Sequence, residues 1–145
     1  MRWVQGEFEV DTDRRRLDAE TIWNYLTRSY WAEGVTRSIV EASFRESLNF
    51  GLYRGTEQIG FARVVTDRAT FAWLCDVFVL DAHRGGGLGK LLLRSVMAHP
   101  DLQDLRRWML ATRDAHGLYS GAGFTTLSDP GRFMEIRRPS PSAGG

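Results

Sequence analysis

The chain has 145 residues, the length of one domain, and its 43% hydrophobic and 26% charged content is typical of a globular protein. The formal net charge of +1 argues against a nucleic-acid partner, which usually meets a surplus of basic residues. The sequence has no long apolar run and no signal-like start, and its only cysteine is Cys75. We therefore expect a cytoplasmic protein with no disulfide and no membrane partner.

The N-terminal third alternates between strand and helix patterns. Phe8 and Val10 alternate with glutamates, which predicts a short strand. A helix is predicted over residues 18–29, where Asp18 can cap the first turn. A second helix is predicted over residues 38–47, because Ser38 and the glutamate three residues later have the spacing of a capping box.

The rest of the chain predicts a sheet with two further helices. Strands are expected at 49–54, 58–65, 69–80, 106–112, 124–127 and 132–137, and helices from 88 to just before Pro100 and over 115–123. This order predicts one mixed α/β domain over residues 1–138, with about four helices, a mostly antiparallel mixed sheet and one parallel crossover. Residues 139–145 carry no apolar anchor and are expected to form a flexible tail.

The segment HRGGGLGK joins the strand at 69–80 to the helix that follows it. A helix N-terminus leaves N–H groups without partners, and glycines let an anion approach them closely. A plain turn would need fewer glycines than this segment has, so the pattern favours an anion site. The Walker pattern fails at Arg84 and Leu91, and the dinucleotide pattern fails at Lys90.

Two motifs carry a family resemblance. The spacing R-x-x-G-x-G, from Arg84 to Gly89, resembles the acetyl-CoA signature of the GNAT acetyltransferase superfamily. The segment LYSGAGF, from Leu118 to Phe124, resembles the family's L-Y-x-x-x-G-F segment. The resemblance extends over about residues 8–137, and it implies a GNAT fold in which the sheet splays between the fourth and fifth predicted strands, 69–80 and 106–112.

The resemblance also implies where acetyl-CoA binds as co-substrate. Its pantetheine arm is expected to pair with the strand near Val77 and Val79, as an added strand would. Its pyrophosphate is expected on the N–H groups of the glycine loop. The expected cofactor contacts are Val77, Phe78, Val79, Arg84, Gly85, Gly86, Gly87, Leu88, Gly89, Lys90, Thr112 and Tyr119. Thr112 stands where many relatives have asparagine.

The same resemblance implies an acetyl transfer to a primary amine. Tyr119 corresponds to the family tyrosine that gives a proton to the leaving thiolate. Some relatives have a glutamate base at a position near Trp73, where this chain has no carboxylate. Asp76 is the nearest candidate base, either directly or through a water, and a purely structural carboxylate is the alternative. Cys75 could be a nucleophile, but a lone strand cysteine usually packs in the core, so direct attack is favoured.

The acceptor side is expected at the loop between the first two helices. Tyr30, Trp31, Glu33 and Trp73 are the candidate substrate-binding residues, with the aromatics facing an ammonium group; closure of the core is the alternative for the aromatics. No His, Cys and carboxylate cluster has ligand spacing, so no metal is expected. The partner is then a small-molecule or peptide amine, and a homodimer is possible. A non-catalytic acyl-CoA binder is the alternative function.

Overall fold

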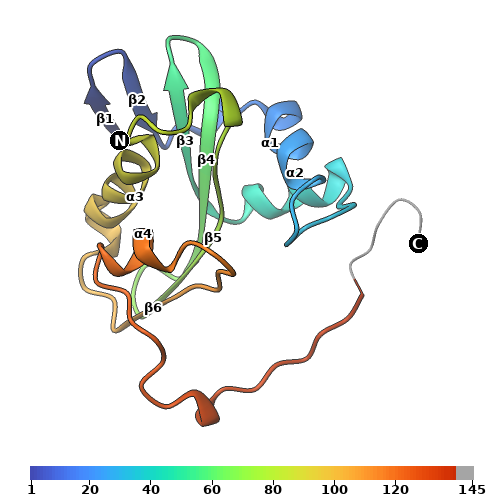
Figure 1. Ribbon diagram of the computed structural model, residues 1–145, viewed down its shortest axis with the longest axis vertical. Coiled ribbons are helices and arrows are strands. Elements are labelled where there is room, and N and C mark those ends of the chain that lie inside the picture. The colour runs from blue at the N-terminus through green and yellow to red at the C-terminus, as the bar shows by residue number, and fades with distance from the viewer. Residues whose placement is uncertain (140–145) are drawn as a thin grey trace.

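The computed structural model describes residues 1–139, which form one six-stranded sheet with the strands in chain order (Figure 1). All neighbouring strands are antiparallel except the last pair. The strands are β1 Arg2–Gln5, β2 Phe8–Asp11, β3 Leu48–Arg54, β4 Glu57–Thr66, β5 Phe71–Val79 and β6 Arg107–Met109. The mostly antiparallel mixed sheet predicted from the sequence is confirmed.

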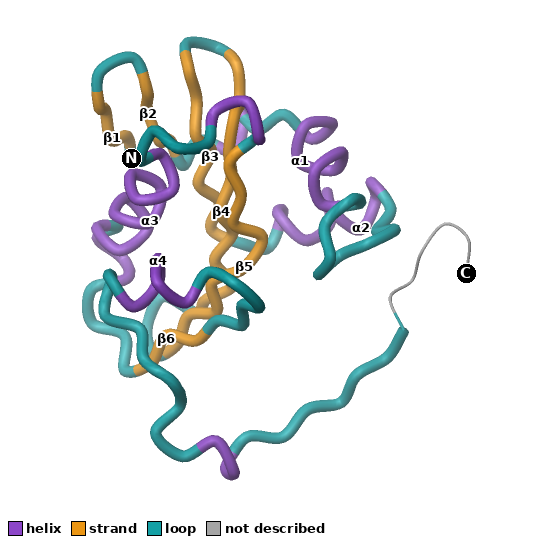
Figure 2. The backbone as a smooth tube through the Cα atoms, in the orientation of Figure 1, coloured by secondary structure: helices purple, strands orange, loops and turns teal. Residues whose placement is uncertain are grey.

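Helices cover both faces of this sheet (Figures 1 and 2). They are α1 Ala19–Leu26, α2 Arg37–Arg45, α3 Leu88–Ala98 and α4 His116–Ser120. The apolar face of α3 packs on β2 to β5 in the larger core, which includes Leu92 and Val96, both fully buried. α1 and α2 cover the opposite face through a smaller core around Ile22 and Phe78.

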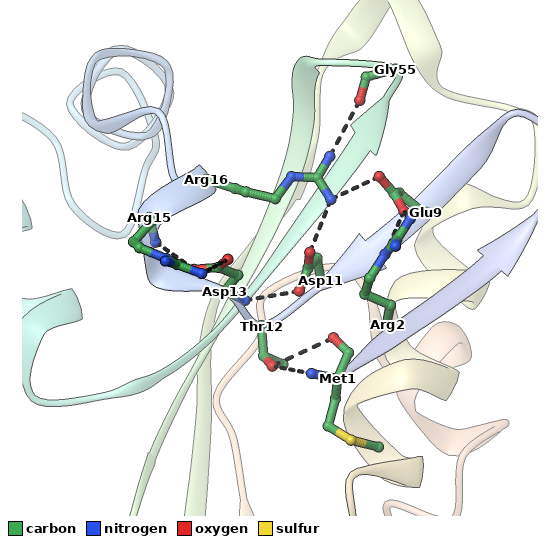
Figure 3. Close-up of polar contacts among 9 residues, drawn as sticks. All are labelled: Met1, Arg2, Glu9, Asp11, Thr12, Asp13, Arg15, Arg16 and Gly55. Carbon is green, nitrogen blue, oxygen red and sulfur yellow. Dashed lines mark hydrogen bonds and ion pairs between the residues drawn. The ribbon is translucent and has the colours of Figure 1, made fainter.

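The N-terminal strand β1 was not predicted, because its residues give only a weak pattern before the Gly6 turn. It pairs with β2 as a hairpin, and Gly6 has a φ of +60°. Charged side chains tie the hairpin to the following 3-10 turn (Figure 3). Arg16 contacts Glu9 at 2.7 Å and Asp11 at 2.9 Å, and Arg2 pairs with Glu9 from the neighbouring strand. These ion pairs support a strand that local sequence alone does not specify.

The caps of the first two helices show one confirmed prediction and one error. The Asp18 side chain accepts a hydrogen bond from the Thr21 N–H at 3.2 Å, as expected for the cap of α1. α2 instead begins two residues earlier than predicted. Thr36 caps it by accepting from the Ile39 N–H at 3.3 Å, so the predicted cap at Ser38 is wrong. Threonine at the cap accepts from an N–H group of the first turn, as serine at a cap would.

The C-terminal strands predicted at 124–127 and 132–137 are wrong, because neither segment pairs with a strand of the described chain. A 3-10 turn at Pro130–Arg132 directs the chain away from the sheet (Figure 2). Strand periodicity predicts extended backbone, but a strand also needs a neighbouring edge to supply its hydrogen bonds. The domain limit at residue 138 and the flexible tail stay predictions, because residues 140–145 lie outside the described part.

His99 makes the folded state sensitive to acid. It is 6% exposed, lies beside the rings of Trp3 and Phe50, and accepts a hydrogen bond from the Asp101 N–H through Nδ1 at 3.1 Å. Burial lowers the pKa of His99, and the nearby carboxylate of Asp101 opposes this effect. The unfolded chain then binds more protons than the folded chain below the ordinary pKa of histidine.

We therefore expect stability to fall as the pH drops from about 6.5 through the lower pKa of the folded state. His99→Asn keeps an acceptor for the Asp101 N–H but has no titrating ring. The slope of unfolding free energy against pH should flatten in the variant by up to about one proton. Urea unfolding of both proteins across this pH range measures the slope. Equal slopes would show that other groups cause the acid sensitivity.

Candidate active site

The sheet opens between β5 and β6. The two strands pair in parallel only over Phe71–Trp73 and Arg107–Met109, while β5 continues to Val79. Beyond Trp73, the edge of β5 that faces β6 has no strand partner within residues 1–139. The predicted splay is therefore confirmed, and it leaves main-chain groups of β5 available to a bound molecule.

A β-bulge in β5 lies within this opening. The register with β4 shifts between Phe61 and Arg63, so that Asp76 and Val77 together oppose one residue of β4. Asp76 has a φ of +53°, which is uncommon for a residue other than glycine. Before the bulge Leu74 faces the larger core, whereas after it Val77 does. The bulge thus changes which side chains β5 presents to each face.

Two adjoining cavities occupy the opening. One, of about 480 Å³, follows the glycine loop and the end of β5. The other, of about 510 Å³, lies over Trp73, Cys75 and Asp76 and reaches Thr112. The residues that line both cavities are Tyr30, Trp31, Val77, Asp114, Ala115 and Tyr119. A molecule spanning the two cavities would have its reacting centre beside this shared set.

The glycine loop forms an open cradle at the start of α3. Gly85 and Gly87 have φ values of +89° and +78°, and Gly87 caps the helix without a side-chain hydrogen bond. A Cβ built on Gly85, Gly86 or Gly87 would meet no atom within 4 Å. The glycines are therefore not demanded by packing within the chain. The first N–H groups of α3 face this unfilled space, as an anion site requires.

Arg84 is already held by three partners. Its Nε donates to the Val79 carbonyl at 3.0 Å, and its guanidinium contacts the hydroxyl of Tyr25 and, at 3.0 Å, the carboxylate of Asp81. These contacts fix the guanidinium beside the cradle. Because the Val79 carbonyl already accepts a hydrogen bond from Arg84, the main-chain groups of Val77 are the better candidates for pairing with an added strand.

Tyr119 lies at the junction of the two cavities, on α4. Its ring contacts the ring of Phe124 edge-on, with centroids 6.1 Å apart. Burial raises the pKa of Tyr119 to about 12. The hydroxyl is therefore protonated throughout the neutral range and can act as a hydrogen-bond and proton donor.

Asp76 holds both oxygens of its carboxylate in contacts across the opening. Arg63 Nε donates to Oδ2 at 2.8 Å, and Trp31 Nε1 donates to Oδ1 at 2.9 Å. Each carboxylate oxygen can accept a further hydrogen bond. Asp76 can therefore both anchor Trp31 and receive a proton or orient a water at the same time.

The comparisons with known proteins agree with this geometry. The family model of the acetyltransferase (GNAT) domain matches residues 45–126. A candidate acetyltransferase of Gibberella zeae is 33% identical over an alignment of 138 residues that covers 81% of this chain and 78% of that protein. The chain belongs to the GNAT family of acetyltransferases.

Solved structures support the same assignment. A candidate GNAT-family acetyltransferase from Xanthomonas campestris pv. campestris is 45% identical, with a TM-score of 0.92 over 97% of this chain and 99% of that one. A predicted acetyltransferase from Clostridium acetobutylicum, solved with acetyl-CoA, is 11% identical with a TM-score of 0.65, over 94% and 96% of the two chains. At that identity the likeness supports the fold alone. GNAT membership makes the chain an N-acetyltransferase, with a fold that binds acetyl-CoA.

The loop after α1 crosses the opening of this GNAT fold, and we call its residues Tyr30 and Trp31 the strap. The Tyr30 hydroxyl accepts from the Arg113 N–H at 3.1 Å, and the Arg113 guanidinium lies 3.8 Å from the centre of the Tyr30 ring. Trp31 reaches the other side through its bond to Asp76, and the two rings of the strap contact each other edge-on. Tyr30 and Trp31 thus join the loop after β6 to the bulge of β5.

Some predicted residues lie away from the two cavities. Glu33 is exposed and lines neither of them, and Gly86 and Lys90 are exposed outside the cavity along the loop. Lys90 instead borders a separate hollow between β1, α3 and α4. Thr112 lines the second cavity, and its hydroxyl accepts from the Ala115 N–H at 3.1 Å.

Several residues of the site were not predicted. Arg63, Tyr25, Arg113 and Asp114 gather at the opening from three separate segments. For Arg63 a signal existed, because an arginine inside the otherwise apolar strand GFARVV requires a partner. For Tyr25, Arg113 and Asp114, no local sequence pattern indicates that their segments lie at the opening between β5 and β6.

Within residues 1–139, no helix is long and apolar enough to cross a membrane. Over the same range, no group of three or more His, Cys, Asp or Glu side chains is arranged to hold a metal ion.

Proposed function

We propose that the protein transfers an acetyl group from acetyl-CoA to a primary amine of a small molecule or peptide, by direct attack within a ternary complex in a cytoplasmic setting. The position of Tyr119 at the junction of two cavities carries this proposal. One cavity ends at an anion cradle, and the other is lined by aromatic rings and a carboxylate. The first cavity therefore suits a donor that carries phosphate groups, and the second suits a cationic acceptor.

The donor side binds the co-substrate through main-chain groups. The N–H groups from Gly85 to Lys90 at the start of α3 would receive the pyrophosphate, with Arg84 beside them. The free edge of β5 near Val77 would pair with the amides of the pantetheine arm. The buried residues Phe78 and Leu88 also line the cavity that would hold the pantetheine arm and the pyrophosphate.

The acceptor side suits a protonated amine in the resting complex. Tyr30, Trp31 and Trp73 offer ring faces, and Asp76 offers a carboxylate in the same cavity. The amine must lose a proton before it attacks, and Asp76 would take that proton directly or through a water. The amine nitrogen then bonds to the acetyl carbon, and the carbon–sulfur bond breaks.

Two groups would stabilise the transfer. N–H groups freed at the bulge of β5 can donate to the oxyanion that forms on the acetyl carbonyl. Tyr119 would donate its proton to the departing thiolate, so the charge left by the bond cleavage is neutralised.

Cys75 supports the direct route over an acetyl-enzyme route. Burial raises the pKa of its thiol to about 12. The thiol is then protonated at neutral pH, and the thiol is a poor nucleophile compared with the thiolate. A covalent intermediate on Cys75 would therefore need a base to remove the thiol proton before the attack.

The proposal is tested by release of free CoA thiol from acetyl-CoA across a panel of small amines, amino acids and short peptides. We expect release that depends on one class of amine and N-acetylated product in equal amount. Binding of acetyl-CoA by calorimetry with no release across the panel would favour the alternative of a non-catalytic acyl-CoA binder. Acetyl-Cys75 trapped before amine addition would contradict the direct route.

Replacing Asp76 distinguishes its proposed role as general base from a role as the hydrogen-bond partner that anchors Trp31. Asp76→Asn keeps an acceptor for Trp31 Nε1 but cannot take a proton, and we expect kcat to fall about 10²-fold. Trp31→Phe removes the same hydrogen bond and keeps the carboxylate, and we expect a fall below about tenfold. Steady-state kinetics with saturating acetyl-CoA measures both, with circular dichroism as a check on folding. Equal losses in the two variants would make Asp76 an anchor of the strap only.

A further inference from the structure

Arg113 brings a guanidinium group without a charged partner to the second cavity, the one of about 510 Å³ over Asp76. Its side chain is exposed, and it forms no ion pair within the described part of the chain. The two other arginines at the opening are both paired, Arg63 with Asp76 at 2.8 Å and Arg84 with Asp81 at 3.0 Å. Among the described arginines of the opening, Arg113 is therefore the one available to an anion that enters the cavity.

The position of this guanidinium is set by Tyr30. The Arg113 Cζ lies 3.8 Å from the centre of the Tyr30 ring, and the Arg113 main-chain N–H donates to the Tyr30 hydroxyl at 3.1 Å. Stacking on a ring uses the flat face of a guanidinium and leaves the N–H groups at its edge available. A carboxylate matches such an edge, because its two oxygens can accept two parallel hydrogen bonds.

The strap connects this guanidinium to a carboxylate. Trp31 follows Tyr30 in the chain and donates to Asp76 at 2.9 Å, and the two rings of the strap lie with their centroids 5.1 Å apart. Arg113 and Asp76 thus contact adjacent residues of the strap, and both line the second cavity. The cavity presents a positive and a negative group together, which is complementary to a molecule that carries both charges.

We infer that the acceptor is a primary amine that also carries a carboxylate, as an amino acid does, and that Arg113 binds this carboxylate while the amine lies toward Asp76. The inference rests on the proposed acetyl transfer and narrows its acceptor. A simple alkylamine would leave the Arg113 guanidinium without a partner. A polyamine would bring a second positive charge beside it, which like-charge repulsion disfavours.

The other charges of the site favour a carboxylate over a phosphate on the acceptor. Asp114 lines both cavities, and after burial and Tyr30 it contributes to the raised pKa of Tyr119, so its carboxylate lies near that tyrosine. Arg113 lines only the second cavity. A dianionic phosphate on Arg113 would therefore add excess negative charge to a site that already has two carboxylates. A carboxylate brings one negative charge, which the guanidinium balances.

Matched acceptors test the inference. A series of amino acids is compared with the amides of their carboxyl groups, and aminoethyl phosphate serves as the phosphate probe. Each is measured at several pH values, so that differences in amine pKa can be corrected. We expect kcat/KM to be about tenfold higher for the best acid than for its amide. Equal values for acid and amide, or a faster reaction of the phosphate, would overturn the inference and leave the acetyl transfer intact.

Arg113→Gln assigns the preference to this side chain. Glutamine keeps a planar group that can lie on the Tyr30 ring, but it has no charge. We expect KM for the acid to rise about tenfold with kcat little changed, and the preference over the amide to disappear. Arg113→Lys keeps the charge without the paired N–H groups, and should restore part of the preference. A variant Arg113→Gln that slows acid and amide alike would show that Arg113 only supports Tyr30, and the inference would fail.

Arg14→Gln is the matched control, because Arg14 is exposed on the 3-10 turn Arg14–Arg16 and lines neither cavity. It should keep the full preference for the acid.

Calorimetry distinguishes a failure of this inference from a failure of the proposed transfer. The same acids and amides are titrated into protein saturated with CoA, so that no reaction is needed. Tighter binding of the acid by wild type but not by Arg113→Gln would support the carboxylate site, even if no amine released CoA and the proposed transfer failed. Equal binding of acid and amide by the wild type would overturn the inference.

Discussion

Tyr119→Phe is expected to lower kcat about 10²- to 10⁴-fold, because the departing thiolate then lacks its proton donor. Affinity for acetyl-CoA should change little, since the ring stays and only the hydroxyl is lost. Steady-state kinetics with the best amine of the panel measures kcat, and calorimetry measures affinity for acetyl-CoA. A loss confined to kcat is the mark of an interaction made in the transition state.

The pH profile adds a second readout for Tyr119. Burial raises the pKa of its hydroxyl to about 12, which keeps the donor form present across the neutral and mildly alkaline range. Rates should therefore rise with pH as the amine loses its proton, without a decline caused by Tyr119 below about pH 10. The raised pKa also makes Tyr119 a weaker acid than a free tyrosine, so its proton passes to sulfur only as the carbon–sulfur bond breaks, through a hydrogen bond that strengthens as charge develops there.

Tyr53→Phe is the matched control for this change. Tyr53 is almost fully buried on β3, two strands away from β5, it lines neither cavity of the opening, and its hydroxyl has no hydrogen-bond partner among the described residues. The same atom is removed, yet kcat should not change and stability should not fall. Equal turnover by wild type and Tyr119→Phe would remove Tyr119 from the mechanism.

The sequence was sufficient for the parts of the fold that depend on local patterns. Apolar periodicity predicts α3 and the strands β3 to β5 within a few residues, and the glycines mark the open loop before α3. The proposed anion site at this loop can be inferred from the sequence because it depends on main-chain groups. A site made of backbone N–H groups needs residues whose side chains leave those groups accessible, and a run of glycines in the sequence indicates such a place.

The acceptor side could not be predicted in the same way. The contact of Trp31 with Asp76 joins positions 45 residues apart, and Tyr30 meets Arg113 across 83 residues. The bulge that turns Asp76 into the opening depends on pairing with β4, which no local pattern specifies. Residues brought together by tertiary contacts of this kind are visible only once the sheet is assembled.

The C-terminal segment shows a different limit. RFMEIR has the alternation of a strand, and the prediction of a strand there is wrong because no strand edge in the described part of the chain pairs with it. Sequence periodicity describes the faces of a segment but not the identity of its neighbour. Met134 and Ile136 are accordingly exposed, although the alternation of the segment would bury them in a sheet.

Gly87→Ala is expected to weaken acetyl-CoA binding about 10- to 100-fold. The added Cβ meets no protein atom within 4 Å, so it projects into the space where an anion would lie. A phosphate displaced by a methyl group loses one hydrogen bond to an N–H group of α3, worth about 1.5–3 kcal/mol when one partner is charged. A tenfold change corresponds to about 1.4 kcal/mol, which gives the expected range.

The substitution also strains the backbone, and Gly55→Ala separates strain from loss of the anion contact. Gly55 lies in the hairpin turn between β3 and β4 with a φ of +61°, and a Cβ there also meets nothing within 4 Å. Both variants should lose about 1–2 kcal/mol of stability by adopting left-handed backbone with a side chain. Only Gly87→Ala should lose affinity for acetyl-CoA by calorimetry. If both variants bind acetyl-CoA as the wild type does, the pyrophosphate does not lie on the start of α3, and the donor cavity must hold the co-substrate by other groups.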